Sequence, residues 1–216
     1  MKTTRFKLVS MALPYVAVYV GLYVLKSAWI TIGLYHFGIM AFLIADAPGK
    51  LLKSIRSGWN FTAAVISIVV CALIIPVIFI FWQYMQLEDT CLRATLTDFG
   101  LYGSSWYFFM IYFSTVQPFL EELYWRSYLE NSHKFFSLTD LAFAGYHIFI
   151  LAWFIKLPWL VVAFIVLTAV AYGFRYIACR FKGLAVPLLS HIAADISIIT
   201  AANLLIRQSQ TVNVCA

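Results

Sequence analysis

The stretch FTAAVISIVVCALIIPVIFIFW, which runs from Phe61 to Trp82, contains no charged side chain. About 20 apolar residues in a helix cross the roughly 30 Å hydrocarbon core of a bilayer, so this stretch predicts a membrane span. The whole chain has the same character, because 63% of its 216 residues are hydrophobic and only 11% are charged. A soluble domain is about 45–50% apolar and about 25% charged. We therefore expect an integral membrane protein.

This composition excludes other classes of protein. A soluble globule of this length could not hide so much apolar surface from water, and disordered chains are poor in apolar residues. The formal net charge of +6 is better explained by orientation in the lipid bilayer than by affinity for nucleic acid, so we expect no nucleic-acid partner. We predict an all-α, polytopic transmembrane helix bundle that forms a single domain over residues 1–216.

Breaks at charges, prolines and polar clusters divide the chain into about seven candidate spans. Their ranges are 8–25, 28–45, 61–82, 105–128, 138–155, 157–175 and 184–206. With the N-terminus in the cytosol, eleven Lys and Arg side chains fall on the cytosolic side, and four fall outside: Lys26, Arg93, Lys156 and Arg207. This is the positive-inside pattern. We therefore expect an N-in, C-out topology with loops 46–60 and 176–183 in the cytosol and loop 83–104 outside.

The four cysteines carry little functional signal. Cys71, Cys91, Cys179 and Cys215 form no CxxC motif and show no ligand-like spacing to histidine. We expect them to be small apolar residues in or near helices. Cys215 is second from the end, so the C-terminus is not itself a prenylation box.

Ionisable side chains inside the predicted spans are the strongest functional signal. A charge near the bilayer centre costs at least about 2.5–3.5 kcal/mol, which makes each one a functional candidate. Six ionisable side chains of the last four spans are our candidates: Glu121, Glu122, Arg126, His147, His191 and Asp195. We interpret His36, in the second span, as a hydrogen-bonded histidine that packs between helices.

Two of these pairs are spaced to meet on one helix face. Glu122 and Arg126 are four residues apart with the carboxylate first, which is the favourable order for an ion pair. If they neutralise each other, Glu121 is directed elsewhere around the helix and can face another partner. His191 and Asp195 are also four residues apart, so the carboxylate can orient the imidazole.

Three of the candidates also share a depth in the membrane. Counted from the cytosolic helix ends at about 1.5 Å per residue, Glu121, His147 and His191 lie roughly 10–14 Å along their helices. Three helices thus present an acid and two imidazoles at one level. A purely structural polar network between helices would have the same appearance.

Three short motifs on three late spans carry a resemblance to a known family. Glu121-Glu122-Leu-Tyr-Trp-Arg126 matches EExxxR, Phe143-Ala-Gly-Tyr-His147 matches FxxxH, and His191-Ile-Ala-Ala-Asp195 matches HxxxN/D. In this order they resemble the CPBP family of intramembrane proteases, the CAAX proteases and bacteriocin-processing enzymes that are also called the Abi family. The resemblance covers the motif-bearing core, about residues 105–206, and EExxxR contributes most of it.

Peptide hydrolysis needs a deprotonated water, a group that holds the oxyanion, and a proton for the leaving amine. Glu121 is the candidate general base, and His147 on the next helix can hold the same water from the other side. His191 can donate to the oxyanion. The resemblance implies these same catalytic roles and adds Asp195, because it assigns the HxxxN/D pair to the oxyanion hole.

Supporting roles fall to Glu122 and Arg126, as the ion pair that fixes the helix face, and to Phe143 of the FxxxH motif. Asp195 fits its assignment less simply than an asparagine would, because an ionised carboxylate repels an oxyanion. Either Asp195 is protonated, or it only accepts from His191, which is then the sole donor. The family pattern tolerates aspartate at this position.

A metal is the alternative way to use the same side chains. Glu121, His147 and His191 would make a catalytic zinc set with water as the fourth ligand. The sequence has no HExxH motif, however, and the resemblance implies a glutamate-type enzyme that works without metal. We therefore predict no metal and no other cofactor, with zinc as the alternative.

The leading functional prediction is an intramembrane endopeptidase that opens to the cytosol and cleaves a membrane-associated protein or peptide. A catalytically idle binding or immunity protein of the same fold is one alternative. A small proton-coupled transporter is another, although the chain shows no internal repeat. Candidate substrates are a prenylated CAAX tail, a bacteriocin-like leader and a membrane-anchored signalling or sorting substrate. The compact chain favours a prokaryotic plasma (inner) membrane and a non-prenylated peptide.

Overall fold

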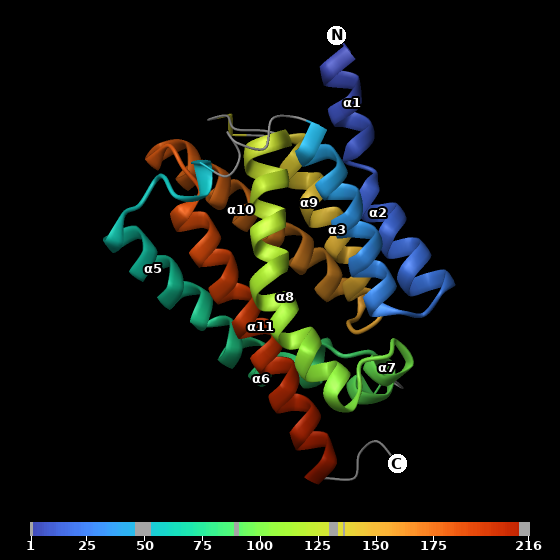
Figure 1. The fold of residues 1–216 in the computed structure, drawn as a ribbon. Helices are drawn as coiled ribbons and strands as arrows, with labels where there is room; N and C mark the ends of the chain where they lie inside the picture. The colour runs from blue at the N-terminus through green and yellow to red at the C-terminus, as the bar shows by residue number, and fades with distance from the viewer. Residues whose placement is uncertain (1, 46–52, 89–90, 130–133, 136, 212–216) are drawn as a thin grey trace.

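The computed structural model describes residues 2–45, 53–88, 91–129, 134–135 and 137–211, which are helical over most of their length (Figure 1). In chain order the helices are α1 (Lys2–Ser10), α2 (Leu13–Val18), η1 (Tyr19–Val24), α3 (Ala28–Ala45), α5 (Phe61–Ala72), α6 (Ile74–Met85), α7 (Leu92–Asp98), α8 (Gly103–Glu121), η2 (Glu122–Leu129), α9 (Leu138–Leu151), α10 (Leu157–Phe181) and α11 (Ala185–Thr211). The segments η1 and η2 are π-helical. The prediction of an all-α protein is confirmed for the described residues.

Within the described residues, five helical segments are long and apolar enough to cross a membrane: Phe6–Val24, Ala28–Ala45, Phe61–Met85, Leu157–Phe181 and Ala185–Ser209. The other two expected spans are also helical, as α8 with η2 and as α9, but neither is among the five. Helix α9 ends at Leu151, before the expected boundary. The chain then turns to hydrogen-bond with the end of α6, where Ile155 pairs with Gln86 and Lys156 N donates to Met85 O over 2.8 Å.

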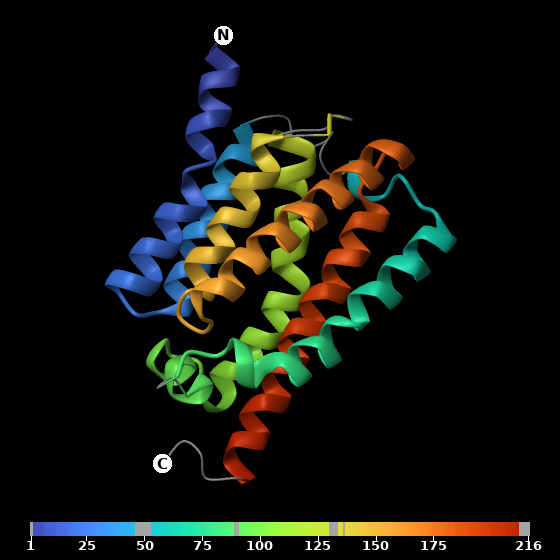
Figure 2. The same ribbon diagram turned by 180° about the vertical axis from the view of Figure 1, so that it is seen from behind.

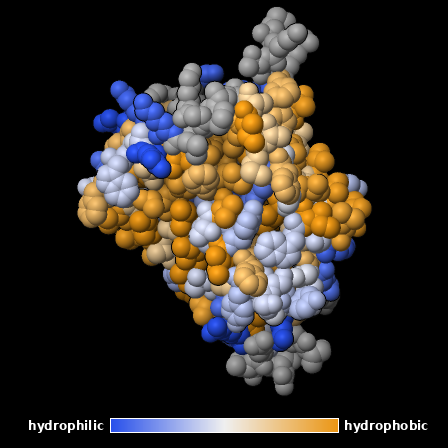
Figure 3. Space-filling model, viewed as in Figure 1, coloured by the Kyte–Doolittle hydropathy of each residue, from blue (hydrophilic) through white to orange (hydrophobic). Residues whose placement is uncertain are grey.

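The most apolar helices face outward. In the apolar windows of Phe61–Met85 and Leu157–Phe181 only 11% of the residues are buried inside the protein. Figure 3 shows apolar side chains across the middle of the molecule and hydrophilic ones at its upper left and at its lower end. Exposed apolar surface of this extent is unfavourable in water, whereas helices that satisfy their own backbone hydrogen bonds are stable in lipid. The five apolar helices thus indicate an integral membrane protein.

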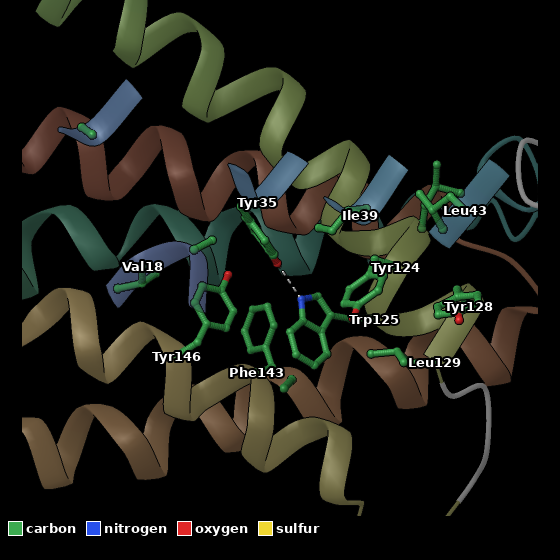
Figure 4. Close-up of a cluster of buried hydrophobic side chains, with 14 of the residues drawn as sticks. Val18, Tyr35, Ile39, Leu43, Tyr124, Trp125, Tyr128, Leu129, Phe143 and Tyr146 are labelled. Atoms are coloured by element: carbon green, nitrogen blue, oxygen red, sulfur yellow. Dashed lines mark hydrogen bonds between the residues drawn. The ribbon is translucent and has the colours of Figure 1, made fainter. Parts of the chain in front are cut away.

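An aromatic cluster joins α3, η2 and α9 (Figure 4). Tyr124, Trp125 and Tyr146 are at most 2% exposed. The rings of Trp125 and Tyr146 are stacked with centroids 5.9 Å apart, and Phe143 meets both rings edge-on. Because aromatic side chains bury large areas and prefer such geometries, the cluster holds η2 firmly between its neighbours.

The start of α11 is attached to the segment that precedes α5. Helix α10 ends at Phe181, and the residue that caps it, Lys182, has a left-handed φ of 57°. Leu184 N then donates to Ser54 O over 2.8 Å, and Ala185 N donates to Ser57 O over 3.0 Å. Gly183 lies directly against the backbone of Ser57, so that a β-carbon there would clash. These contacts fix where α11 begins, and α11 then packs against α5, α6 and α8.

The helices at the two ends of the chain lie at opposite ends of the bundle. Helix α1 extends beyond one end, and the last turns of α11 extend beyond the other (Figures 1 and 2). A chain that crosses the membrane an odd number of times would have this arrangement, and the number of spans stays a prediction. The side of the membrane on which each terminus of the chain lies also stays a prediction.

The cysteines differ in part from what we expected. Cys71 is buried in α5 and Cys179 is half-buried in α10, in agreement with their interpretation as small apolar residues. Cys91, at the N-cap of α7, instead takes part in a disulfide bond. Cys215 lies outside the described residues. The spacing of four scattered cysteines contained no signal for this bond.

Candidate active site

The two adjacent glutamates lie where α8 passes into η2. Glu121 ends α8, Glu122 begins η2, and both side chains are completely buried. Pro118 precedes them inside α8. Because proline has no N–H, the α-helical hydrogen-bond ladder is interrupted there, and the chain continues from Glu122 with wider π-helical turns. Such turns occur frequently at functional sites.

His191 brings both glutamates and Asp195 together. Its Nδ1 lies 2.8 Å from Glu122 Oε1, and its Nε2 lies 3.5 Å from Glu121 Oε2 and 3.8 Å from Asp195 Oδ1. The ring is 4% exposed. With Glu122 ionised, its oxygen can only accept, so Nδ1 carries the proton of that hydrogen bond. The closest carboxylate to His191 is thus Glu122, rather than Asp195 as the helical spacing suggested, because the ring points from α11 across to η2.

The expected pair of Glu122 and Arg126 is present. Arg126 Nη1 lies 3.3 Å from Glu122 Oε1, and the guanidinium, 2% exposed as a residue, lies 4.4 Å from the ring centroid of Phe143. Glu122 Oε1 is therefore shared between Arg126 and His191. Phe143, the first residue of the FxxxH motif, contacts the cation on one side and the ring of His147 on another, with centroids 4.5 Å apart.

Two tyrosines that the sequence patterns did not indicate hold Glu121. Tyr35 from α3 donates its hydroxyl to Glu121 Oε1 over 2.8 Å, and Tyr146 from α9 donates to the same oxygen. Trp125 Nε1 donates to the Tyr35 oxygen over 3.0 Å, the bond drawn in Figure 4. Tyr35 and Tyr146 are neighbours of His36 and His147 in sequence, but no motif distinguishes them from the other tyrosines.

His147 reaches Glu121 through Tyr146. Its Nδ1 lies 2.7 Å from Phe143 O, a carbonyl that accepts the ring proton, and its Nε2 lies 3.2 Å from the Tyr146 hydroxyl. That hydroxyl also contacts Glu121. Glu121, His147 and His191 thus lie in one cluster, in which the Tyr146 hydroxyl donates to Glu121 and lies beside Nε2 of His147.

Several buried polar atoms of this cluster remain available to a bound molecule. Glu121 Oε2, Glu122 Oε2 and Asp195 Oδ2 make no hydrogen bond to any residue that the structure describes. Buried polar atoms in proteins are nearly always hydrogen-bonded, and exceptions concentrate at functional sites. Water and a peptide carbonyl are the kinds of group that acceptors and donors in this arrangement can bind.

The described part of the chain contains no group of three or more His, Cys, Asp or Glu side chains arranged to hold a metal ion. The zinc alternative needs Glu121, His147 and His191 as ligands. His147 is instead directed toward Tyr146, and its other ring nitrogen is engaged by a backbone carbonyl. Independence from metal stays a prediction.

His36 occupies the position expected of a packing histidine. It is 3% exposed, and its Nδ1 lies 2.8 Å from the hydroxyl of Tyr112 on α8. Its ring also lies beside that of Tyr35, with centroids 5.5 Å apart. His36 therefore helps to fix α3 against α8.

Comparison with known proteins finds one family model that matches part of the chain. Residues 103–197 match the family model described as "Type II CAAX prenyl endopeptidase Rce1-like". This match covers less than half of the chain, and we refer to residues 103–197 as the Rce1-like segment. It contains all seven residues that the sequence motifs indicated. No curated protein and no solved structure is significantly similar to the chain. Tyr35 lies outside the Rce1-like segment.

Replacement of Arg126 by alanine is expected to destabilise the fold. The substitution removes the cation that lies beside the buried Glu122 and on the ring of Phe143. Removing one partner of a buried ion pair lowers the free energy of unfolding by on the order of 3–5 kcal/mol, because the other charge is left unpaired. Thermal unfolding in detergent should show a clearly lowered Tm for Arg126→Ala. The exposed Arg207 provides the control, since Arg207→Ala should leave the Tm nearly unchanged. An Arg126→Ala protein as stable as the wild type would contradict a structural role for the pair.

Proposed function

We propose that this protein is an intramembrane endopeptidase that hydrolyses a peptide bond of a membrane-associated protein or peptide. The observation that carries the proposal is the environment of Glu121. This completely buried carboxylate is held through one oxygen by two tyrosines, while its other oxygen faces His191 at 3.5 Å. A buried acid with one oriented oxygen beside an imidazole is the arrangement that a general base requires. Glu121, Tyr146 and His191 all lie within the Rce1-like segment.

In the proposed reaction Glu121 Oε2 takes a proton from a water molecule as that water attacks the carbonyl carbon of the substrate. The hydroxyl group of the water becomes part of the new carboxyl group. The C–N bond then breaks, and the proton held by Glu121 passes to the leaving amine. His147, linked to Glu121 through Tyr146, helps to hold the water.

His191 is proposed to stabilise the oxyanion. Its Nδ1 donates to Glu122, so Nε2, which is directed toward Glu121 Oε2 and Asp195, can donate to the oxyanion when the ring carries a second proton. A hydrogen-bond donor that is already oriented where negative charge develops lowers the barrier of acyl transfer without reorganisation. Asp195 assists either as a protonated second donor or as the carboxylate beside a protonated His191.

Glu122 and Arg126 act through other residues. The hydrogen bond from His191 Nδ1 to Glu122 fixes the ring orientation, and Arg126 offsets the buried charge of Glu122. The ring of Phe143 contacts both the Arg126 guanidinium and the His147 ring, and so helps to hold them in place. Catalytic groups need such support, because small displacements of a base or a donor are costly in rate.

The family description names CAAX prenyl endopeptidases, so a C-terminal CAAX tail is one substrate class that we propose for this chain. A non-prenylated membrane-anchored peptide is the second. We further propose seven spans in a prokaryotic plasma membrane, with the N-terminus and the opening of the site on the cytosolic side. The disulfide bond of Cys91 supports this orientation, because disulfides persist on the oxidising side of such a membrane and Cys91 lies in the loop assigned to the outside.

Glu121→Gln and His147→Ala should each abolish cleavage and leave the protein folded. Loss of a general base typically costs about 10²–10⁴-fold in rate, and glutamine keeps the shape of the side chain without its basicity. The measurement compares the N-terminal peptides in membranes of cells that express wild type, Glu121→Gln or His147→Ala at equal levels. A cleavage present with wild type alone identifies the substrate.

The matched control is Glu88→Gln. Glu88 forms a surface ion pair with Lys156, with 2.9 Å between Nζ and Oε1, and its side chain is 83% exposed. Because Glu88 is not one of the site residues, the loss of its charge should not alter cleavage. Full activity of Glu121→Gln on an identified substrate would contradict the proposed role of Glu121.

Metal independence is the second expectation for the activity. Because the proposed base is a carboxylate rather than a metal-bound water, cleavage should survive strong chelators, and the purified protein should contain no stoichiometric zinc by elemental analysis. Activity that is removed by a chelator and restored by zinc would instead make Glu121, His147 and His191 metal ligands.

The orientation can be tested with added cysteines in a background that carries Cys71→Ala and Cys179→Ala. Glu88 and Lys53 are exposed positions on loops that we assign to opposite sides. A membrane-impermeant maleimide added to intact cells should label Glu88→Cys, and should label Lys53→Cys only after permeabilisation. The background protein without an added cysteine sets the baseline. The reverse pattern would overturn both the topology and the cytosolic opening.

A further inference from the structure

Glu121 receives two hydroxyl donors on the same oxygen. Tyr35 and Tyr146 come from different helices, α3 and α9, and both hydroxyls meet at Oε1. Both tyrosines are at most 5% exposed. A carboxylate oxygen can accept two hydrogen bonds, and bonds to an ionised acceptor are about twice as strong as neutral ones. Oε1 is therefore held from two sides, and the carboxyl group cannot rotate without breaking both bonds.

Trp125 determines the direction of the bond from Tyr35. The indole N–H is a donor only, and it donates to the Tyr35 oxygen over 3.0 Å (Figure 4). Tyr35 has a single hydroxyl proton, which is thus directed away from the indole and toward Glu121 Oε1 at 2.8 Å. Trp125 itself is 2% exposed and stacked on Tyr146, so this donor is held in place by the same aromatic cluster.

We propose that Tyr35 is a positioning residue for Glu121, and that together with Tyr146 it assigns the two carboxylate oxygens to different tasks. Oε1 is the anchored oxygen, and Oε2, which faces His191, is the oxygen that acts on water. The inference rests on the proposed function for its catalytic meaning. It extends the site to α3, outside the Rce1-like segment 103–197, and gives that helix a role in the reaction.

The test uses Tyr35→Phe, which keeps the ring and removes only the hydroxyl. Full-length protein in nanodiscs is studied by infrared difference spectroscopy, in which the bands lost in Glu121→Gln identify the Glu121 carboxyl group. In Tyr35→Phe those bands should shift, because one of the two donors on Oε1 is gone. The Tm should remain close to that of the wild type.

Kinetics provide the second readout. The probes are an internally quenched peptide with a farnesylated CAAX end and the same peptide without the prenyl group. The loss of one hydrogen bond to a charged group should lower kcat about 10- to 100-fold, whereas KM should change by less than about two-fold, because Tyr35 acts on the base and not on substrate binding. A merely structural tyrosine would change the Tm without this separation of kcat from KM.

Tyr15→Phe is the matched control. Tyr15 also donates its hydroxyl from the first helices to α9, to Ala142 O over 2.9 Å, but it does not contact Glu121. This variant should leave the Glu121 bands and kcat unchanged. If Tyr35→Phe does not fold, Tyr146→Phe tests the same oxygen, and its Glu121 bands must shift.

Unshifted Glu121 bands in the folded variant would overturn the proposal, and so would shifted bands with an unchanged kcat in an active enzyme. The infrared measurement needs no substrate. Shifted bands in a protein whose wild type cleaves neither peptide would therefore support the anchoring of Glu121 and count against the proposed function alone.

Discussion

The burial of two adjacent carboxylates is the constraint on which the rest of this structure depends. Glu121 and Glu122 are both fully buried in a bundle that is otherwise largely apolar. Isolated charges in such surroundings are very costly, so each must be hydrogen-bonded or paired. The chain meets this requirement with groups from four helical elements besides α8. Proteins keep such costly buried carboxylates mainly at functional sites.

The two glutamates are stabilised in different ways, and this difference separates their roles. Glu122 has a cation, Arg126, and the imidazole of His191 on one oxygen. Glu121 has two neutral phenols on one oxygen, while the other faces Nε2 of His191. Neutral donors hold a carboxylate in place without an adjacent cation to neutralise it. Glu121 therefore has only neutral donors on its anchored oxygen, whereas Glu122 has a cation beside it.

The backbone arrangement follows from the same requirement. The interruption at Pro118 and the π-helical turns of η2 direct two successive side chains into the bundle, and the aromatic cluster holds η2 against α3 and α9. The start of α11 is fixed by contacts of Gly183, Leu184 and Ala185 with the segment before α5. These contacts also determine where His191 lies along the bundle.

The sequence predicts the helices and the pair of Glu122 and Arg126 well, since both depend on local patterns. Apolar runs mark membrane helices, and the four-residue spacing of Glu122 and Arg126 indicated a pair that the structure contains. The partners contributed by tertiary structure could not be predicted. Tyr35 is one of 13 tyrosines, and nothing in its neighbourhood shows that α3 packs beside Glu121. His191 was assigned to Asp195 on its own helix, but its short contact is with Glu122 across the bundle.

Glu121 is proposed to activate water rather than to attack the substrate itself. Single-turnover cleavage with excess enzyme in ¹⁸O-labelled water tests this claim directly by mass spectrometry of the product. General-base catalysis predicts one ¹⁸O atom in the newly formed carboxyl group of the peptide and none in the side chain of Glu121. An unlabelled product carboxyl group together with ¹⁸O in Glu121 would reveal a covalent acyl intermediate and contradict this account.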